Sequence, residues 1–437
     1  MIPITGMFLL ALIQLIPLPA SVIRIISPQA LIIKNLSNNA YLGDVVQWLS
    51  RTSGSRLISD TIFPWNCLSI YPYAGWYKLL FYIAMGMIFY SFIMAVNSKQ
   101  EIRVIVIAVI ISGIIHAFIY LISYLKGQPL MSQWYGYEMK KVGGTFVNRD
   151  HYAAYLSMVL PVLAAWTFYY SNQFSRSQRS RVSKVVTFMQ AKKGIVAYMI
   201  IVLVLMSVGQ LFSLSRAGIG SCLCSFIILI YLFSHRVERM KITTMLFLVI
   251  LVIVTLTYWI GYYPILERFK LIPYEWESKI GRWVVWQDSM KIVKDFPVAG
   301  VGLANFSNAF IHYKRFSDIR YRYAHNDVLQ FLVEMGIFGL MLLIITVIFF
   351  YRQIITYPWQ LHSRTRALVL GLTAGTIAVL IHSFFDFPLQ IPANALLLAV
   401  YCGLLYASIK VDTIDRINRI KEKQEAKQFL LEKPHEE

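Results

Sequence analysis

A histidine set among arginines is the first feature of this sequence that could carry out a reaction. Residues 320–327 read RYRYAHND and end directly before a long apolar run. The imidazole of His325 can accept a proton near neutral pH, which suits a general base. Arg320 and Arg322 could bind a phosphate, although a basic collar against lipid headgroups would use the same two residues. A histidine that only hydrogen-bonds at a membrane surface is the structural alternative for His325.

Two further arginines stand where a charge is unexpected. Arg216, in the stretch SLSRAG, falls between two apolar runs, where a charged side chain usually faces a cavity or a partner. Arg282, in the stretch GRW, is the second candidate. A guanidinium presents a planar fork of donors that matches phosphate oxygens. The structural alternatives are a helix-hairpin cap for Arg216 and a side chain that snorkels from an interfacial helix for Arg282.

The remaining candidates are weaker. Asp386, in HSFFDFP at the end of an apolar run, could orient His325, neutralise an arginine or simply be solvated. Arg149, in NRDH, opens another apolar run and is a weak phosphate candidate. Residues 297–302 read PVAGVG and resemble half of a nucleotide fingerprint, but no strand–helix–strand unit surrounds them, so we interpret them as a tight turn. No Cys or His pair has ligand spacing in a loop, so no metal site is expected.

The composition indicates which solvent the elements carrying these residues face. Hydrophobic residues make up 57% of the chain and charged residues only 14%, against about a quarter in soluble domains. The formal net charge of +19 would suggest nucleic acid in a soluble protein. Here the basic residues cluster in short segments between apolar runs, which is typical of cytoplasmic loops beside anionic lipid. We therefore expect membrane lipid, and no nucleic acid, as a partner.

Apolar runs recur along most of the chain. A membrane-crossing helix needs about 20 mostly apolar residues, and this measure gives about ten spans. The sequence thus predicts an all-α polytopic membrane protein. The expected spans are 5–26, 76–96, 104–124, 151–170, 195–214, 217–234, 242–262, 328–351, 367–385 and 392–409.

The basic connections predict the orientation of these spans. The connection 171–194 carries several Lys and Arg residues and no acidic residue, and further basic clusters follow at 236–241, at 352–366 and in the tail. An even number of expected spans separates each cluster from the next, so all lie on one side, which the positive-inside rule assigns to the cytoplasm. The long connection 263–327 then lies on the opposite, periplasmic side.

Two segments outside the spans show helical spacing. Apolar residues at 280, 283, 286, 290 and 293 predict an amphipathic helix on the membrane surface, and those at 411, 414, 417 and 420 predict a cytoplasmic helix. We therefore expect four parts. They are N-terminal transmembrane helices with periplasmic and basic cytoplasmic loops (1–262), a large periplasmic loop with catalytic residues (263–327), C-terminal transmembrane helices (328–409) and a cytoplasmic tail (410–437).

Taken in order, a series of short motifs resembles the O-antigen ligase and polymerase superfamily. Any single motif is weak, but the ordered set with a consistent topology is specific. The matching stretches are Gln14–Pro19, Gly144–Asn148, Ser213–Gly218, Gly281–Trp283, Pro297–Asn305, Ala324–Gly336 and His382–Pro392. The opening segment resembles an inner span of family members, so the first spans of the family pattern are expected to be missing here.

The resemblance implies a GT-C-like fold and an inverting glycosyltransferase, without metal or cofactor, in the bacterial inner membrane. The donor would be a glycan on undecaprenyl diphosphate and the acceptor a lipid A core, joined at the periplasmic face. By the same resemblance, Arg216 and Arg282 would bind the donor diphosphate and His325 would activate the acceptor hydroxyl. The further candidates for binding or support are Arg149, Arg320, Arg322, Asn326 and Asp386.

The superfamily leaves the reaction open. Ligases, polymerases that join repeat units and oligosaccharyltransferases acting on protein share these motifs, and the single large loop with His325 favours a ligase. Some relatives have been named as inorganic-carbon carriers, so a small-anion transporter is the alternative of another class. A transporter should place charges at mid-membrane on broken helices, whereas the candidate charges here gather at the outer face, which favours an enzyme.

Overall fold

The structure is a computed structural model of the 437-residue chain. It describes residues 2–41, 65–127, 144–177, 185–234, 250, 253–255, 257–271, 273–274, 281–315, 320–356 and 360–432. Helices make up almost all of the regular structure in these residues. The exception is a short antiparallel pairing between β1 (Leu18–Pro19) and β2 (Trp65–Asn66). The prediction of an all-α protein is confirmed.

Eight helices among the described residues are long and apolar enough to cross a membrane. They correspond to eight of the expected spans, and the two runs that flank Arg216 are separate helices. The chain is therefore a multi-pass membrane protein. The helices are α6 (Pro72–Ala95), α7 (Lys99–Lys126), α8 (Arg149–Ser177), α9 (Val185–Phe212), α10 (Arg216–Ser234), α16 (Asp327–Thr356), α17 (Ser363–His382) and α18 (Pro392–Glu432).

The opening segment differs from the single span expected over 5–26. Helix α1 (Ile2–Leu15) ends before Pro17, the chain then forms β1, and a new helix α2 (Ala20–Ile26) follows. Pro17 and Pro19 explain the break, because proline lacks the amide donor and disfavours helical backbone in the residue before it. Helix α3 (Pro28–Tyr41) comes next. The expected span 242–262 lies largely outside the described residues.

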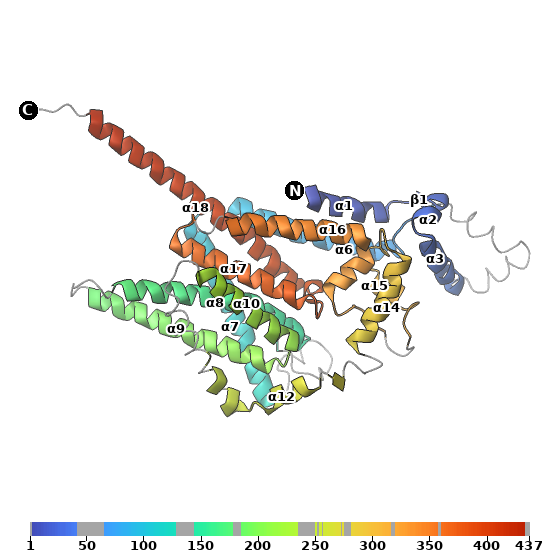
Figure 1. Ribbon diagram of the computed structural model, residues 1–437, viewed down its shortest axis with the longest axis horizontal. Coiled ribbons are helices and arrows are strands. Elements are labelled where there is room, and N and C mark those ends of the chain that lie inside the picture. The colour runs from blue at the N-terminus through green and yellow to red at the C-terminus, as the bar shows by residue number, and fades with distance from the viewer. Residues whose placement is uncertain are drawn as a thin grey trace, which may run out of the picture. The chain divides into compact units, whose positions relative to one another are not determined.

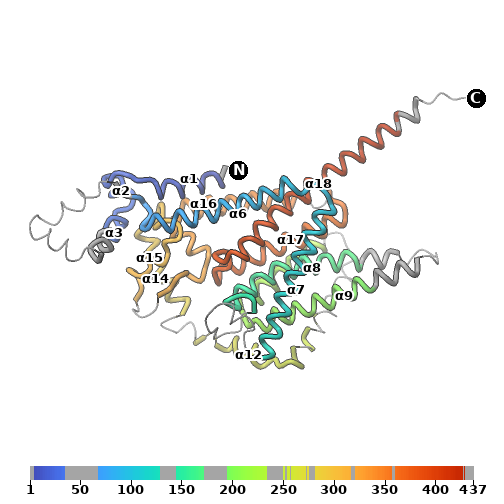
Figure 2. The backbone as a smooth tube through the Cα atoms, turned by 180° about the vertical axis from the view of Figure 1, so that it is seen from behind, coloured from blue at the N-terminus to red at the C-terminus, as the bar shows by residue number. Residues whose placement is uncertain are grey.

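The chain divides into two compact units, and the first comprises Met1–Met85, Lys270–Arg352 and Ser383–Leu389. In this unit α1, the first part of α6 and α16 run side by side (Figure 2). They share a small core that includes Leu15, Leu79 and Met335. The unit also holds α14 (Arg282–Asp295), α15 (Phe306–Phe310) and the short helix η3 (Pro388–Gln390), of which Gln390 already belongs to the second unit.

The amphipathic helix expected in the 263–327 connection is present as α14. Its side chains Val285 and Ile292 enter a second buried cluster together with Phe306 and Phe310. The predicted apolar face is divided, because Trp286 packs against this cluster whereas Trp283 and Met290 are exposed. Helix α14 therefore belongs to a folded part of this connection that has its own hydrophobic core. A shorter helix, α12 (Tyr263–Lys270), begins the same connection.

The expected tight turn at 297–302 is confirmed, and its partner is a kink in α16. Gly336 interrupts that helix with φ 67° and ψ −172°. The backbone N–H groups of Val301 and Ile337 donate hydrogen bonds to the carbonyls of Val333 (2.9 Å) and Pro297 (2.9 Å). A Cβ at Gly336 would lie 2.2 Å from the carbonyl oxygen of Val298, so only glycine fits.

The second unit comprises Gly86–Phe269, Gln353–His382 and Gln390–Glu437 and is built around α8 (Figure 1). Helix α8 is almost completely buried along its apolar stretch and packs against α9, α10 and α17. Gly371 and Gly375 of α17 permit the close approach to α8, since a Cβ at Gly375 would lie 2.5 Å from the Met158 carbonyl oxygen. The helix expected over 411–420 is confirmed as a continuation of α18.

Candidate functional site

His325 lies in the loop that leads into α16. Asn326 caps that helix, because its side-chain oxygen accepts a hydrogen bond from the Leu329 N–H at 2.9 Å. The backbone of His325 is in the left-handed region, with φ 52°. This conformation is uncommon for a residue other than glycine and costs of order 1–3 kcal/mol. It must therefore be held by the surroundings of His325.

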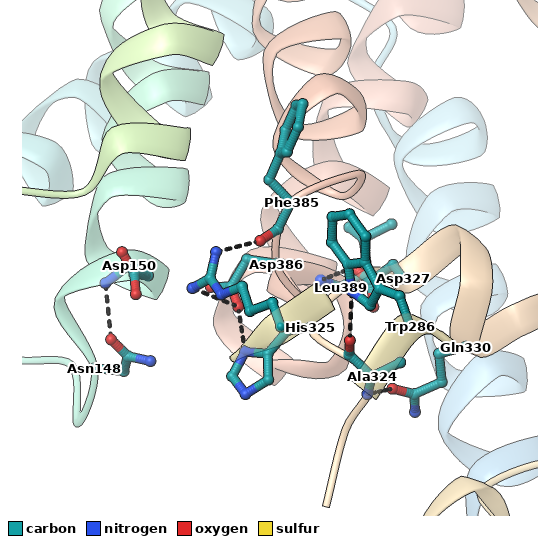
Figure 3. A network of polar contacts seen from close by, with 11 residues as sticks. Asn148, Asp150, Trp286, Ala324, His325, Asp327, Gln330, Phe385, Asp386 and Leu389 are labelled. Atoms are coloured by element: carbon teal, nitrogen blue, oxygen red, sulfur yellow. Dashed lines mark hydrogen bonds and ion pairs between the residues drawn. The ribbon is translucent and has the colours of Figure 1, made fainter. Parts of the chain in front are cut away.

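The imidazole of His325 hydrogen-bonds to a buried carboxylate (Figure 3). His325 Nδ1 lies 3.1 Å from Asp386 Oδ1, and the Asp386 side chain is 0% exposed while that of His325 is 31% exposed. A carboxylate at this position favours the tautomer with its proton on Nδ1, which leaves the lone pair of Nε2 able to accept a proton. The ring of Phe387 packs edge-on against the imidazole, with centroids 4.9 Å apart. These two contacts thus define the orientation of the imidazole ring.

Arg282, the first residue of α14, contacts the loop that carries Asp386. Its Nη1 donates a hydrogen bond to the Phe385 carbonyl oxygen at 2.5 Å, and its Nη2 lies 3.8 Å from Asp386 Oδ1. The Arg282 side chain is 39% exposed. Among the predicted residues, the structure thus brings Arg282, His325 and Asp386 together. Asp386 contacts both His325 and Arg282, and its carboxylate is buried, so the alternative of a solvated carboxylate does not apply.

Asp327 fixes the loop that carries Asp386. Its backbone N–H donates to the carbonyls of Ser383 (2.8 Å) and Asp386 (3.1 Å). Its carboxylate accepts from the Ser383 hydroxyl (3.2 Å) and from the Leu389 N–H (3.0 Å). Residues 383–389 are therefore tied to the N-terminus of α16, two residues after His325.

The other two arginines of this segment are peripheral in the structure. Arg320 and Arg322 are both exposed. The guanidinium of Arg322 lies over the ring of its neighbour Tyr323, 5.9 Å from the centroid. Burial raises the pKa of Tyr321, so the phenol between the two arginines stays neutral over a wider pH range.

Arg216 and Arg149 belong to the second unit. Each is the first residue of a helix, Arg216 of α10 and Arg149 of α8, and each is half-buried. Ser215 caps α10, because its hydroxyl accepts from the Gly218 N–H at 3.2 Å. Asn148 caps α8 through the Asp150 N–H at 2.9 Å. The cap residues are thus the neighbours of the two arginines.

The two helix starts in the second unit lie close together. A Cβ at Gly218 of α10 would lie 2.4 Å from the Cβ of Ala153 in α8, so the first turns of the two helices are in tight contact. The Ser157 hydroxyl of α8 also donates to the Gly218 carbonyl oxygen at 3.1 Å. Since a helix N-terminus carries a partial positive charge, this end of the unit combines two such termini with two guanidinium groups.

Residues 201–344 match a family model described as O-antigen ligase. This segment of the chain is therefore similar to O-antigen ligases. The match covers about a third of the chain and includes Arg216, Arg282 and His325, whereas Arg149 and Asp386 lie outside it. The resemblance to the O-antigen ligase and polymerase superfamily is thereby confirmed. No curated protein matches the chain.

Sequence reasoning missed three residues that hold the segments around His325 and Asp386. Asp327 appeared only as part of a motif, although an acid at the start of a span is a recognisable signal for a functional or structural partner. Gln330 and Trp286 hydrogen-bond to the backbone of Ala324, directly before His325. Nothing in the spacing of the sequence pairs either residue with Ala324.

Proposed function

We propose that this protein is a membrane glycosyltransferase of the O-antigen ligase type. It transfers a glycan from undecaprenyl diphosphate to a lipid A core acceptor at the periplasmic face of the bacterial inner membrane. The observation that carries the proposal is the contact of His325 with buried Asp386, together with the contacts of Arg282 to Asp386 and to the Phe385 carbonyl oxygen. This arrangement combines a base with a phosphate-binding group, as expected for transfer from a diphosphate.

In the reaction, His325 Nε2 takes the proton of the acceptor hydroxyl. The acceptor oxygen then forms a bond to the anomeric carbon of the donor sugar, from the face opposite to the leaving group, so the configuration inverts. The bond between the anomeric carbon and the diphosphate oxygen breaks, and undecaprenyl diphosphate leaves with the electron pair. The proton stays on His325 as imidazolium, which Asp386 stabilises.

Arginines stabilise the charge that grows on the leaving diphosphate. Arg282 is the candidate in the first unit, because it stands beside His325 and Asp386 and is partly exposed. Arg216 and Arg149 are the candidates in the second unit, each at the positive end of a helix. Such preorganised donors act on charge that develops only in the transition state, so no metal is required.

The decisive experiment deletes the gene in its host and complements it with the wild-type protein, His325→Ala or His312→Ala. His312 is an exposed histidine of the same periplasmic connection and serves as the matched control. We expect deletion and His325→Ala to abolish the long-chain lipopolysaccharide ladder on a gel, with undecaprenyl-linked polymer accumulating, and His312→Ala to restore the ladder.

Other outcomes of the same gel would replace the proposal. A core that carries a single repeat unit would identify a polymerase. An unchanged ladder would exclude ligation to lipid A core and direct attention to glycosylated protein. In a separate assay, uptake of labelled bicarbonate into vesicles that disappears when the protein is absent would identify an anion transporter.

A further inference from the structure

The residue before His325 has both of its backbone groups fixed by side chains. The Ala324 N–H donates to Gln330 Oε1 at 3.2 Å, and the Ala324 carbonyl oxygen accepts from Trp286 Nε1 at 3.0 Å (Figure 3). Ala324 is 0% exposed. Since both groups are withdrawn from water, loss of either partner would leave a buried polar group unpaired. The peptide units that lead into His325 are therefore set by two residues of different helices.

Gln330 is itself held by a buried carboxylate. Its Nε2 donates to Glu334 Oε1 at 3.0 Å, one helical turn further along α16. Glu334 also accepts from the Ala304 N–H at 2.9 Å and from the Phe306 N–H at 3.4 Å. Both Gln330 and Glu334 are almost fully buried. The amide of Gln330 therefore has a fixed orientation, with its oxygen toward Ala324.

These contacts act on the strained residue of the site. His325 has φ 52°, and the hydrogen bonds at Ala324 before it and at Asp327 after it enclose this single left-handed residue. A residue other than glycine relaxes toward ordinary backbone angles when such restraints are removed. Such a change of the backbone angles at His325 would turn the imidazole away from Asp386, because the 3.1 Å contact depends on the direction of the backbone at His325.

We propose that Gln330 is a positioning residue for His325. Its amide is held by Glu334 and in turn holds the backbone N–H of Ala324, the residue before His325. Gln330 thereby keeps the imidazole of His325 hydrogen-bonded to Asp386 without contacting the substrate. Trp286 of α14 has a matching role, because it fixes the carbonyl group of the same residue, Ala324. This inference rests on the proposed role of His325 as general base, but the placement of the ring can be measured independently of transfer.

The test variant is Gln330→Met, which keeps the side-chain volume and removes both hydrogen bonds. The matched control is Gln353→Met on the same helix, whose amide oxygen accepts from the Tyr406 hydroxyl. Two readouts are taken on purified full-length protein: transfer kinetics, and the rate at which diethylpyrocarbonate modifies His325, followed by mass spectrometry. Trp286→Phe, which keeps an aromatic ring without its N–H, is the second variant in case Gln330→Met fails to fold.

We expect Gln330→Met to lower kcat on the order of 10- to 100-fold, as misplacement of a catalytic group does, with little change in the KM of the donor. The modification rate of His325 should change in Gln330→Met and stay as in the wild type in Gln353→Met. In the His325→Ala background, Gln330→Met should have no further effect on residual transfer, because its action passes through His325.

The outcomes separate this inference from the proposed function. An unchanged modification rate of His325, or the same fold-loss of transfer with and without His325, would overturn the positioning role. If the modification rate changes while His325→Ala transfers normally, the positioning role stands and the general-base role of His325 is wrong.

Discussion

Asp386 Oδ1 lies 3.1 Å from His325 Nδ1, while the carboxylate of Asp386 has no exposure to solvent. A buried carboxylate loses most of its hydration, so its negative charge is directed to its few partners in the protein. Its partners include His325 and, at 3.8 Å, Arg282. In the proposed mechanism, the charge of Asp386 therefore stabilises the imidazolium that forms when His325 takes a proton.

Replacement of that charge tests the pair directly. Asp386→Asn keeps the size of the side chain but removes the charge and permits the wrong imidazole tautomer, so transfer should fall by about 10²-fold or more. Donor binding should persist, because the arginines remain. Transfer is measured with purified protein and donor in excess. Asp415→Asn on α18, which alters an ion pair with Lys99 of α7, is the control and should transfer normally. Normal transfer by Asp386→Asn would remove Asp386 from the mechanism.

Arg282 offers a test of geometry as well as charge. Arg282→Lys keeps the positive charge but cannot contact both the Phe385 carbonyl oxygen and a second acceptor with a planar fork. We expect the kcat/KM of Arg282→Lys to lie between that of the wild type and that of Arg282→Ala. The kcat/KM of Arg282→Ala should be lower than that of the wild type by about 10²-fold or more. Arg416→Lys, on the exposed part of α18, should leave kcat/KM unchanged. Equal activity of Arg282→Ala and the wild type would end the leaving-group proposal for this residue.

The proposed function requires His325 to lie on the periplasmic side of the membrane, and this can be tested. His312 is exposed in the predicted periplasmic connection, and Arg419 is exposed on the predicted cytoplasmic helix. In a background without the natural cysteines, a membrane-impermeant maleimide should label His312→Cys in intact spheroplasts and should label Arg419→Cys only after lysis. The reverse pattern would invert the topology and place His325 in the cytoplasm.

Sequence patterns predicted those features that depend on neighbours along the chain. Hydropathy located eight spans, and the helical spacing near Trp286 located α14. Sequence order could not choose among the alternatives for Asp386, because its contact with His325 joins residues 61 positions apart. Helical spacing also could not show that Trp286 hydrogen-bonds to Ala324, because tertiary packing determines which side of an amphipathic helix is buried.

The kink in α16 should be intolerant of any side chain. Gly336→Ala would bring a Cβ to 2.2 Å from the Val298 carbonyl oxygen at a φ of 67°, so the turn at 297–302 must shift. We expect a loss of stability of about 1–3 kcal/mol or more, seen as a lower thermal midpoint in detergent. Gly86→Ala in α6 is the control, since a Cβ there meets nothing within 4 Å. Gly86→Ala should be neutral or stabilising by up to about 1 kcal/mol, whereas equal midpoints for the two variants would contradict the packing of the turn.

Lys34 should make stability depend on pH in the alkaline range. Its ammonium donates to the Cys67 carbonyl oxygen, and burial lowers the pKa of Lys34 to about 8, against about 10.4 in the unfolded chain. Between these values the unfolded state binds more protons than the folded state, so the contribution of Lys34 to stability rises with pH and is lost as pH falls through about 8. The thermal midpoint of the wild type, minus that of Lys34→Met, should therefore increase from pH 8 toward pH 10.

Lys126→Met, at the exposed end of α7, is the control, and the difference between its midpoint and that of the wild type should stay constant over the same pH range. A flat difference for Lys34→Met as well would mean that Lys34 keeps its proton in the folded protein, and the burial of its ammonium would then have to be compensated by a partner charge.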